Sequence, residues 1–387
     1  MVKVGIAAGY MTKFAEHWQR SLKDLAAESV VGLFEEAENI TPDRIGITIV
    51  GNMASGQLIG QEHLGPLVVD HGGLLPAAGV KVEAAGASGA LALRTGYLYI
   101  KSGLYDVALV VGVEKMTDQT RSAKITSVLS SASDQEWELQ TGLTFAGSYA
   151  LMTKAHFEKY GTNKRHIAAV SAKNHANAVY NAKAQFRRAF TIDQVVGAAM
   201  VADPLGLLDC SPASDGAAAV LLCSEKVINE ITDTPVWITG SGHASDSLSL
   251  AQRENLHSMK ATRLAGKQAY EQAGVEPDAI RVAEMHDNFS ITEILGIEDL
   301  GFFLPGQGGP ATLDGETQIG GKVTTNPSGG LKALGHPLGA TGVAQAVEIF
   351  KQLRREVEPQ RQADAEIGLT HSIGGTGSTA IVHVYQR

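Results

Sequence analysis

The segment Ser88–Lys101 limits the possible folds of this chain more than any other, because small and apolar side chains occupy nearly every position in it. Its only charged residues are Arg94 and Lys101, so the pattern predicts a helix that is buried on most of its faces. Apolar segments at Val80–Ala84 and Asp106–Val113 predict strands before and after this helix. A buried helix between two strands belongs at the centre of a layered α/β domain.

The order of the predicted elements occurs twice along the chain. Residues 1–235 and 236–387 each give alternating strands and helices, with one central helix late in each half. The other expected strands are Val2–Ala8, Arg44–Val50, Val236–Gly240, Arg281–His286, Ile367–His371 and Ser378–Val384, and the other expected helices are 22–37, 64–70, 259–273 and 291–300. We therefore predict two similar α/β halves, packed so that the N-termini of their central helices meet.

Residues 117–190 interrupt this order with a polar, partly helical segment that we interpret as an insertion between core elements. Between Gln119 and Phe190 the chain has ten Lys and Arg residues against four Asp and Glu. A basic island in a chain of net charge −9 indicates either an anionic small ligand, such as a nucleotide diphosphate, or a solvated helical surface. The charge of this segment alone leaves both readings open.

The composition excludes several other classes of protein. The net charge of −9 argues against nucleic acid as the main partner. No apolar run approaches the roughly 20 residues that span a bilayer, and the first residues predict a strand rather than a signal peptide. With only Cys210 and Cys223, we expect no disulfide framework and no metal site. These features predict a cytoplasmic protein that does not bind membranes.

His336 is the first candidate for chemistry. It lies in the segment Thr325–Gly342, which is rich in glycine and turn-forming residues, and a helix-period run follows it. The neighbouring Pro337 fixes φ, so the imidazole is held at a bend before a buried helix. A histidine in this position is suited to proton transfer near neutral pH, although it could also only cap the helix.

Seven segments of the chain, taken together, resemble the thiolase superfamily, and most of all its archaeal branch related to the sterol-carrier-protein thiolases. They are Val50–Met53, Val82–Gly89, Val111–Met116, Asp209–Gly216, His286–Phe289, 326–342 and His371–Gly377. The resemblance covers almost the whole length. It implies a thiolase fold, with two pseudosymmetric α/β halves in a five-layer αβαβα sandwich and an inserted loop domain. It also implies an acetyl-CoA acetyltransferase type of activity, with a coenzyme A thioester as substrate and no metal.

The resemblance assigns roles to four positions of the catalytic site. His336 would activate a cysteine nucleophile, and His286 with His336 and a water would form one oxyanion hole. The main-chain N–H groups of residue 86 and Gly374 would form the second. The nucleophile's place is occupied by Gly86, however, and the place of the second, acid/base cysteine by Asn288.

No other side chain replaces the missing thiols easily. The alternative place for the second cysteine holds Ser372. Cys210 lies in a turn and Cys223 at the end of an apolar strand, and Ser88 is better suited to cap the helix. A glycine at position 86 still supplies its N–H group and would leave a space where the thiol was.

Three explanations of Gly86 remain open at this point. It could be a substitution introduced to trap a ligand, the mark of a natural cysteine-independent chemistry, or the mark of an inactive scaffold. We therefore expect carbon–carbon bond formation or cleavage on acyl-CoA of the acetoacetyl-CoA type. The alternatives are a cysteine-independent retro-aldol lyase and a non-catalytic subunit that binds or channels CoA esters.

The resemblance also suggests ligand contacts and partners. Arg187 and Arg188 are candidates for binding the CoA phosphates, and Thr262 and Phe289 for lining the pantetheine tunnel. A homodimer or tetramer is expected, with the apolar strand at Val80–Ala84 as the pairing edge. A small zinc-ribbon/OB-fold protein is a further expected partner, because members of this branch often work beside one.

Overall fold

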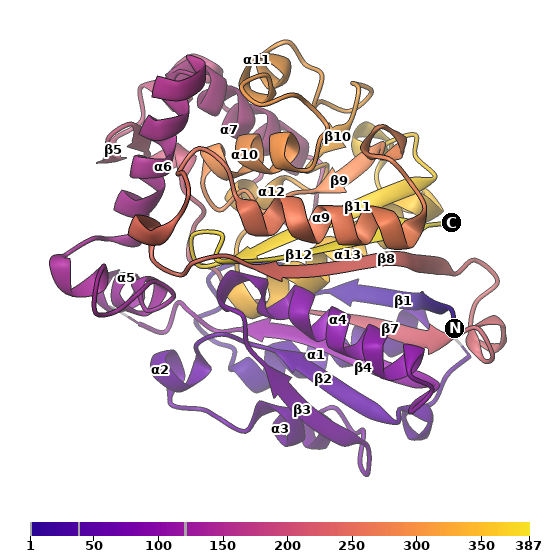
Figure 1. Ribbon diagram of the computed structural model, residues 1–387. Coiled ribbons are helices and arrows are strands. Elements are labelled where there is room, and N and C mark those ends of the chain that lie inside the picture. The colour runs from indigo at the N-terminus through magenta and orange to yellow at the C-terminus, as the bar shows by residue number, and fades with distance from the viewer. Residues whose placement is uncertain (1, 38, 120–121) are drawn as a thin grey trace.

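The computed structural model describes residues 2–37, 39–119 and 122–387 and contains one large, mixed sheet (Figure 1). Its strand order is β10-β9-β11-β12-β8-β1-β7-β4-β2-β3. The first half contributes β1 (Val4–Met11), β2 (Ile47–Gly51), β3 (Ala78–Val82), β4 (Val107–Glu114) and β7 (Gly216–Ser224). The second half contributes β8 (Val236–Ser245), β9 (Val282–Glu284), β10 (Thr324–Thr325), β11 (Ile367–Gly374) and β12 (Thr379–Gln386).

The two halves have the same topology. In the first, β2 is parallel to β3 and β4, and β7 is antiparallel to β4 and β1. In the second, β9 is parallel to β10 and β11, and β12 is antiparallel to β11 and β8. Only the pairs Gly5–Trp237 and Ile6–Val236 join β1 to β8. The predicted duplication is therefore confirmed, as two five-stranded units that meet along one short seam.

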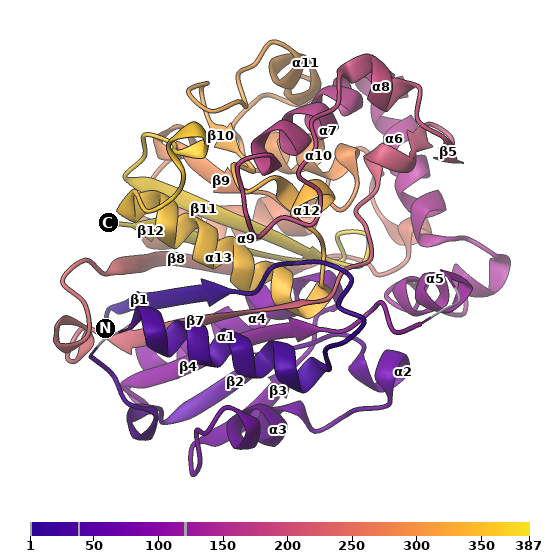
Figure 2. The ribbon, with the colours of Figure 1, turned by 180° about the vertical axis from the view of Figure 1, so that it is seen from behind.

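Helices complete the five layers. The central pair is α4 (Ser88–Lys101) and α13 (Leu338–Arg354), which pack against each other. Helices α1 (Leu22–Glu36) and α3 (Leu64–His71) cover the outer face of the first half, and α9 (Lys260–Ala273) and α10 (Ser290–Asp299) cover that of the second. Figures 1 and 2 show α9 and α1 on opposite faces of the molecule.

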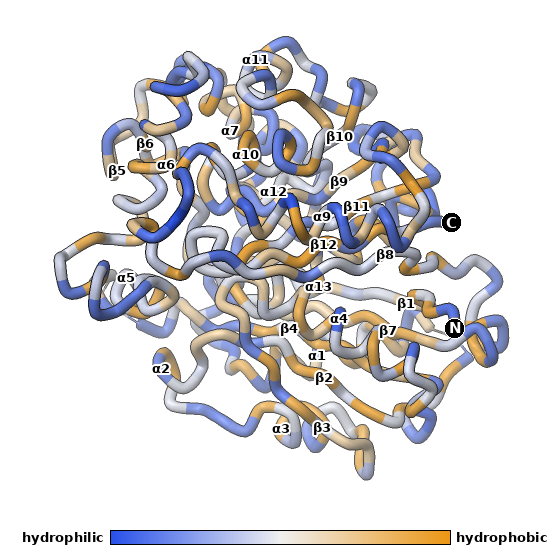
Figure 3. Tube along the Cα trace, viewed as in Figure 1, coloured by the Kyte–Doolittle hydropathy of each residue, from blue (hydrophilic) through white to orange (hydrophobic). Residues whose placement is uncertain are grey.

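The three largest apolar clusters of the described residues fill the spaces between these layers. One surrounds α4 and α13 and combines strand residues of both halves, such as Val110 and Tyr385. The other two lie beneath α1 and α3 and beneath α9 and α10. Figure 3 shows the hydrophobic residues gathered along strands such as β2 and β4, with hydrophilic segments towards the rim. Among the described residues, no helix combines the length and hydropathy that crossing a bilayer requires.

The N-termini of the two central helices meet, as predicted, because glycines allow their backbones to touch. A Cβ atom added to Gly89 would lie 2.6 Å from the carbonyl oxygen of Gly339. A Cβ atom on Gly342 would overlap the main-chain nitrogen of Ala90. Any side chain at these positions would force the helices apart. The prediction that most of α4 is buried is confirmed, and within the helix only Leu98, at 48%, is exposed.

The segment between β4 and β7 includes residues 117–190, which we interpret as an inserted region. It contains α5 (Ser122–Ser130), α6 (Phe145–Tyr160), α7 (Lys164–Ala178), α8 (Ile192–Val196) and a hairpin of β5 (Met200–Ala202) and β6 (Leu205–Gly206). The shorter helices α2 (Ser55–Ile59), α11 (Gly308–Leu313) and α12 (Gly330–Ala333) connect core elements.

The basic island of this region carries less free charge than its composition indicates. Lys173 forms a buried pair with Glu293, and the half-buried Lys164 pairs with the buried Asp209. Lys154 and Arg165 pair with Asp203 and Asp193. All four carboxylates lie outside the segment in which the charges were counted. Arg121, a further member of the island, lies outside the described residues. The count therefore does not by itself indicate an anionic ligand.

A buried histidine in β12 gives a prediction about stability. His383 is 0% exposed, and neither ring nitrogen has a hydrogen-bond partner within the part of the chain that the structure describes. Burial lowers its pKa to about 3. Since a buried polar group without a partner costs about 1–3 kcal/mol, His383→Leu should raise the free energy of unfolding at neutral pH.

The increase in the free energy of unfolding caused by His383→Leu should become larger as the pH falls. Below the pKa of a histidine in the unfolded chain, about 6.5, unfolding of the wild type takes up a proton that the folded His383 does not bind. The difference between the variant and the wild type should therefore increase by about 1.4 kcal/mol for each pH unit down to about pH 4. Urea unfolding at several pH values measures it, with the exposed His71→Leu as control. A difference that stays constant or shrinks with acidity would contradict the argument.

Candidate active site

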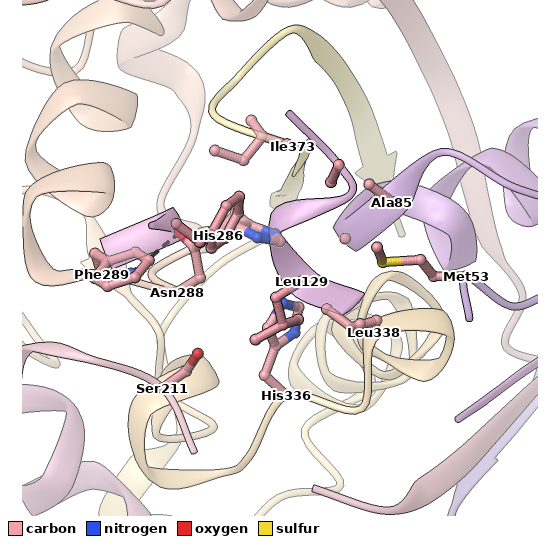
Figure 4. A pocket seen from close by; sticks show the side chains of 14 residues that line it. Met53, Ala85, Leu129, Ser211, His286, Asn288, Phe289, His336, Leu338 and Ile373 are labelled. Carbon is pink, nitrogen blue, oxygen red and sulfur yellow. Dashed lines mark hydrogen bonds between the residues drawn. The ribbon is translucent and has the colours of Figure 1, made fainter. Parts of the chain in front are cut away.

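A pocket lies where the N-termini of α4 and α13 meet, and it brings together residues from both halves and the inserted region (Figure 4). Four of the expected catalytic residues line it: Gly86, His286, Asn288 and His336. The remaining wall is mostly apolar and consists of Met53, Ala85, Leu129, Ala132, Phe145, Ser211, Phe289, Leu338, Ile373 and Gly375.

His336 is held so that one ring nitrogen remains available. Its main-chain N–H donates to Ser214 Oγ at 3.0 Å, and its Nδ1 lies 2.7 Å from Thr341 Oγ1. Because the Thr341 hydroxyl donates to the carbonyl oxygen of Pro337 at 3.1 Å, it must accept the hydrogen of Nδ1. The Nε2 atom of His336 therefore carries a free lone pair and can act as a base.

His286 follows β9 and faces both His336 and position 86. The centroids of the two imidazole rings are 5.0 Å apart, and the ring planes make an angle of 88°. A Cβ atom added to Gly86 would lie 3.1 Å from Cε1 and 3.3 Å from Nε2 of His286, and 3.0 Å from the carbonyl oxygen of Ile373. Gly86 therefore does not leave an open space. Atoms of His286 and Ile373 lie close to it, so a side chain at this position would require these neighbours to move by a few tenths of an ångström.

Both imidazoles are neutral near pH 7. Burial lowers the pKa of His336 to about 3. Burial, and then the nearby His336 and His371, hold the pKa of His286 well below its usual value. An apolar enclosure disfavours the charged form of each ring, and a proton on one ring would further disfavour a proton on the other.

The turn before α4 shows how position 86 is fixed. Ala85 adopts a positive φ of 48°, and Gly86 follows it in a short 3-10 turn. The Ser88 hydroxyl donates to the carbonyl oxygen of Ala85 at 2.7 Å and accepts from the N–H of Ala84 at 2.9 Å. The expectation that Ser88 caps the helix is wrong, because the N-cap residue of α4 is Ala87 and no side chain caps it. The Ser88 hydroxyl instead holds the preceding turn, so it is not a free nucleophile. Gly374 packs against Ala84, beside the pocket residues Ile373 and Gly375.

No thiol lines the pocket. Cys210 donates its Sγ–H to the carbonyl oxygen of Gly206 at 3.4 Å, and burial raises its pKa to about 11. Burial in β7 raises the pKa of Cys223 to about 12. Ser372 is fully buried and donates to Gln345 Oε1 at 2.6 Å. The described residues also contain no group of three side chains that could hold a metal ion.

Of the four residues expected to contact CoA, one lines this pocket. Phe289 lines the pocket and stacks on Tyr149, with ring centroids 4.4 Å apart. Thr262 corrects an expectation, because it is 0% exposed and bonds His371 Nε2 at 2.9 Å, so it lines no tunnel. The guanidinium of Arg187 donates to the carbonyl oxygen of Val179, and that of Arg188 lies 5.2 Å from the Phe190 ring. Neither arginine lies in the wall of this pocket.

Sequence reasoning missed the contribution of the inserted region. Tyr149 and Phe145 come from α6, and Ser211 comes from the chain after the β5–β6 hairpin. Tyr149 is fully buried, and its hydroxyl contacts Asn288 and Gly375. Two aromatic residues four apart in a polar helix were the available signal, because that spacing puts both on one face.

Known proteins match this chain over almost its whole length. Residues 4–226 match the family model "Thiolase, N-terminal domain", and residues 242–387 match "Thiolase C-terminal domain-like". The chain is 48% identical to an acetyl-CoA acetyltransferase of Methanothermobacter thermautotrophicus over the whole of both chains. It is 32% identical to human sterol carrier protein 2, over 97% of this chain and 70% of that protein.

Two solved structures have the same fold. The "Ltp2-ChsH2(DUF35) aldolase" has a TM-score of 0.85 at 22% identity, covering 99% of this chain and 97% of that one. Human mitochondrial 3-ketoacyl-CoA thiolase in complex with CoA has a TM-score of 0.78 at 17% identity, covering 100% and 98%. Two family models that cover nearly the whole chain and a full-length relative of 48% identity show that the chain belongs to the thiolase family, as an acyltransferase of the thiolase type.

Proposed function

We propose that this chain forms or cleaves a carbon–carbon bond next to the thioester of an acyl-CoA, through an enolate and without an acyl-enzyme at position 86. One observation carries the proposal. Two neutral imidazoles, His286 and His336, face Gly86 in a pocket that no thiol lines. The family membership adds the substrate class, since thiolases act on CoA thioesters.

Formation of the enolate is the step that the residues of the pocket support best. His336 Nε2 has the lone pair to accept a proton, and the Thr341 hydroxyl holds the ring by its Nδ1 hydrogen. The main-chain N–H groups of Gly86 and Gly374 are our candidates for holding the thioester oxygen as negative charge develops on it. The N-terminus of α4 adds a positive dipole at Gly86.

Two reactions share this enolate. In acyl transfer, a CoA thiol gives its proton to the imidazole and attacks the C3 carbonyl of a 3-ketoacyl-CoA, and the C2–C3 pair passes to the enolate. In retro-aldol cleavage, the C3 hydroxyl gives up its proton, C3 becomes a carbonyl, and the same pair passes to the enolate. Protonation at C2 then completes either reaction. The closed space around Gly86 favours both over a covalent route, and a related fold belongs to a complex called an aldolase.

A non-catalytic role in binding or channelling CoA esters is the second candidate, because neither cysteine position of the family holds a cysteine. It predicts binding of acyl-CoA without proton transfer. The two imidazoles favour catalysis, since a binding site alone gains nothing from burying two unprotonated bases side by side.

For assembly, we propose a homodimer that pairs along β3. This strand ends the sheet, so one row of its backbone groups has no partner strand among the described residues. The exposed Leu98 lies on α4, which packs against β3. We also propose a small zinc-ribbon/OB-fold protein as a further partner, and the aldolase complex with a DUF35 protein supports this.

Exchange of hydrogen at C2 of the acyl group tests whether the enolate forms. The result does not depend on which of the two reactions the protein catalyses. Acetyl-CoA incubated with the protein in D2O should take up deuterium, measured as a mass increase. His336→Ala should slow the exchange by about 100-fold or more, because the base is removed. His243→Asn, a change of a histidine outside the pocket, serves as control. Because the pKa of His336 is about 3, the exchange should not lose its base between pH 8 and pH 5. Binding without exchange would leave only the channelling role.

Gly86→Cys tests where position 86 lies. The new thiol would face His286 at the N-terminus of α4. The helix dipole lowers a thiol pKa, and a neutral imidazole beside the thiol can accept its proton. It should react with iodoacetamide about tenfold faster or more than Cys210 and Cys223. It should also take an acetyl group from acetyl-CoA, seen as a mass increase that is lost on adding CoA. Gly86→Ala is the matched control. A folded variant that binds CoA but shows neither reaction would contradict the assigned position.

The dimer can be tested at its exposed edge. Leu98→Lys places a charge on the face that we propose is buried between subunits, so it should weaken the dimer. Light scattering at micromolar concentration should then show a smaller mass than for the wild type. Leu304→Lys, at a residue that is 76% exposed in the second half, should have no effect. A wild type that is already monomeric would remove the proposal.

A further inference from the structure

Asn288 occupies the place of the second catalytic cysteine, and its side chain is held by three neighbours. Its Oδ1 accepts from the main-chain N–H of Phe289 at 3.1 Å, and the Thr292 hydroxyl lies 2.9 Å from the same oxygen. Its Nδ2 donates to the Tyr149 hydroxyl at 3.1 Å. Asn288 is 3% exposed, so these contacts fix the amide within the wall of the pocket.

The network allows only one orientation of this amide. A main-chain N–H cannot donate to an amide nitrogen, so the atom facing Phe289 must be the oxygen. The Tyr149 hydroxyl donates its hydrogen to the carbonyl oxygen of Gly375 at 2.7 Å, so it can only accept from Asn288. Asn288 therefore donates a hydrogen bond to Tyr149, and Tyr149 donates one to Gly375.

One hydrogen of the Asn288 amide remains. An amide nitrogen has two hydrogens, and Tyr149 accepts one of them. Within residues 2–37, 39–119 and 122–387, no acceptor for the other is present. A nearly buried donor without a partner costs free energy, and a partner supplied by a bound ligand would remove that cost.

We propose that the second amide hydrogen of Asn288 binds the C3 oxygen of the acyl group, so that the pocket selects acyl-CoA thioesters with oxygen at C3. The proposal rests on the function proposed above and names the residue that holds the C3 oxygen, which both reactions of that function require. An amide can donate this hydrogen but neither takes up nor gives away a proton near neutral pH. Asn288 thus acts as a substrate-binding residue, not as a substitute for the acid/base cysteine.

Tyr149 is the positioning residue for this contact. It orders the amide by accepting one hydrogen, which leaves the other free for the ligand. Its ring stacks on Phe289, the residue that follows Asn288, at a centroid distance of 4.4 Å. The inserted region would in this way set the substrate preference of a site whose bases come from the core.

The test compares two thioesters with four-carbon acyl groups, acetoacetyl-CoA and butyryl-CoA, which differ in the C3 oxygen. Calorimetric titration without free CoA gives a Kd for each. The wild type should bind acetoacetyl-CoA about tenfold more tightly or more, because only it accepts the free hydrogen. Asn288→Asp keeps the shape but has no hydrogen to donate, so the ratio of the two Kd values should fall to about one or below.

Tyr149→Phe is the second variant, because it keeps the aromatic stack and removes only the hydroxyl. It should reduce the ratio by about threefold or more, since the amide is no longer oriented. The control is Tyr270→Phe, which removes a buried hydroxyl that donates to the carbonyl oxygen of Leu300, outside the pocket. That variant should keep the wild-type ratio.

The outcomes separate this proposal from the function on which it rests. A wild type without preference, or an Asn288→Asp variant that keeps the preference or weakens both ligands equally, overturns the role of Asn288. If hydrogen exchange on acetyl-CoA persists in that case, the proposed function stands alone. A wild type that binds neither thioester overturns both.

Discussion

The contact on which the rest of the structure depends is the backbone crossing of α4 and α13. Gly89 meets the carbonyl oxygen of Gly339, and Gly342 meets Ala90, with no side chain between the helices. This contact places the turn at Gly86 beside the bend at His336, although the two residues belong to different halves. A single Cβ at the crossing would separate the helices and move the two parts of the pocket apart.

Burial then decides the chemistry of the histidines. Exposed imidazoles would be partly protonated near neutral pH. The layers around this pocket instead keep both rings in the neutral form. The Thr341 hydroxyl adds direction, because it fixes which nitrogen of His336 keeps its lone pair. The same enclosure explains why Cys210 is no substitute nucleophile, since burial holds its thiol in the protonated form.

The sequence predicted the fold well because its signals are local. The apolar periodicity of Ser88–Lys101 and the strands around it repeat in the second half, and the structure confirms both the duplication and the meeting of the central helices. The residues of the His286 and His336 segments also come together in one pocket. These elements depend on periodicity and turn chemistry, which can be read from neighbouring residues.

Contacts between segments that are far apart in the sequence could not be predicted from such local patterns. Thr262 was expected at the ligand and is buried against His371, because its helix turns that face into the core. Lys173 belonged to an apparent basic island, but its partner Glu293 is 120 residues away. The link from Tyr149 to Asn288 spans 139 residues and depends on how the inserted region folds back. Pairings of this kind are fixed by tertiary packing, which no local pattern records.

By resemblance, Gly86 and Asn288 stand at the two cysteine positions of the family, and together they would change what the site can do. A thiolase cysteine carries an acyl group, and its second cysteine moves a proton during that transfer. A chain that had lost only the first would keep an acid/base group with no acyl-enzyme to act on. Here the resemblance assigns both places to residues without a thiol, and contacts with Phe289, Thr292 and Tyr149 hold the Asn288 amide in one orientation. An inactive scaffold has no need of such order, because a disordered polar group would be cheaper to solvate than to bury. The pair of residues therefore fits our proposal of enolate chemistry without covalent transfer, in which Asn288 binds the substrate's own oxygen.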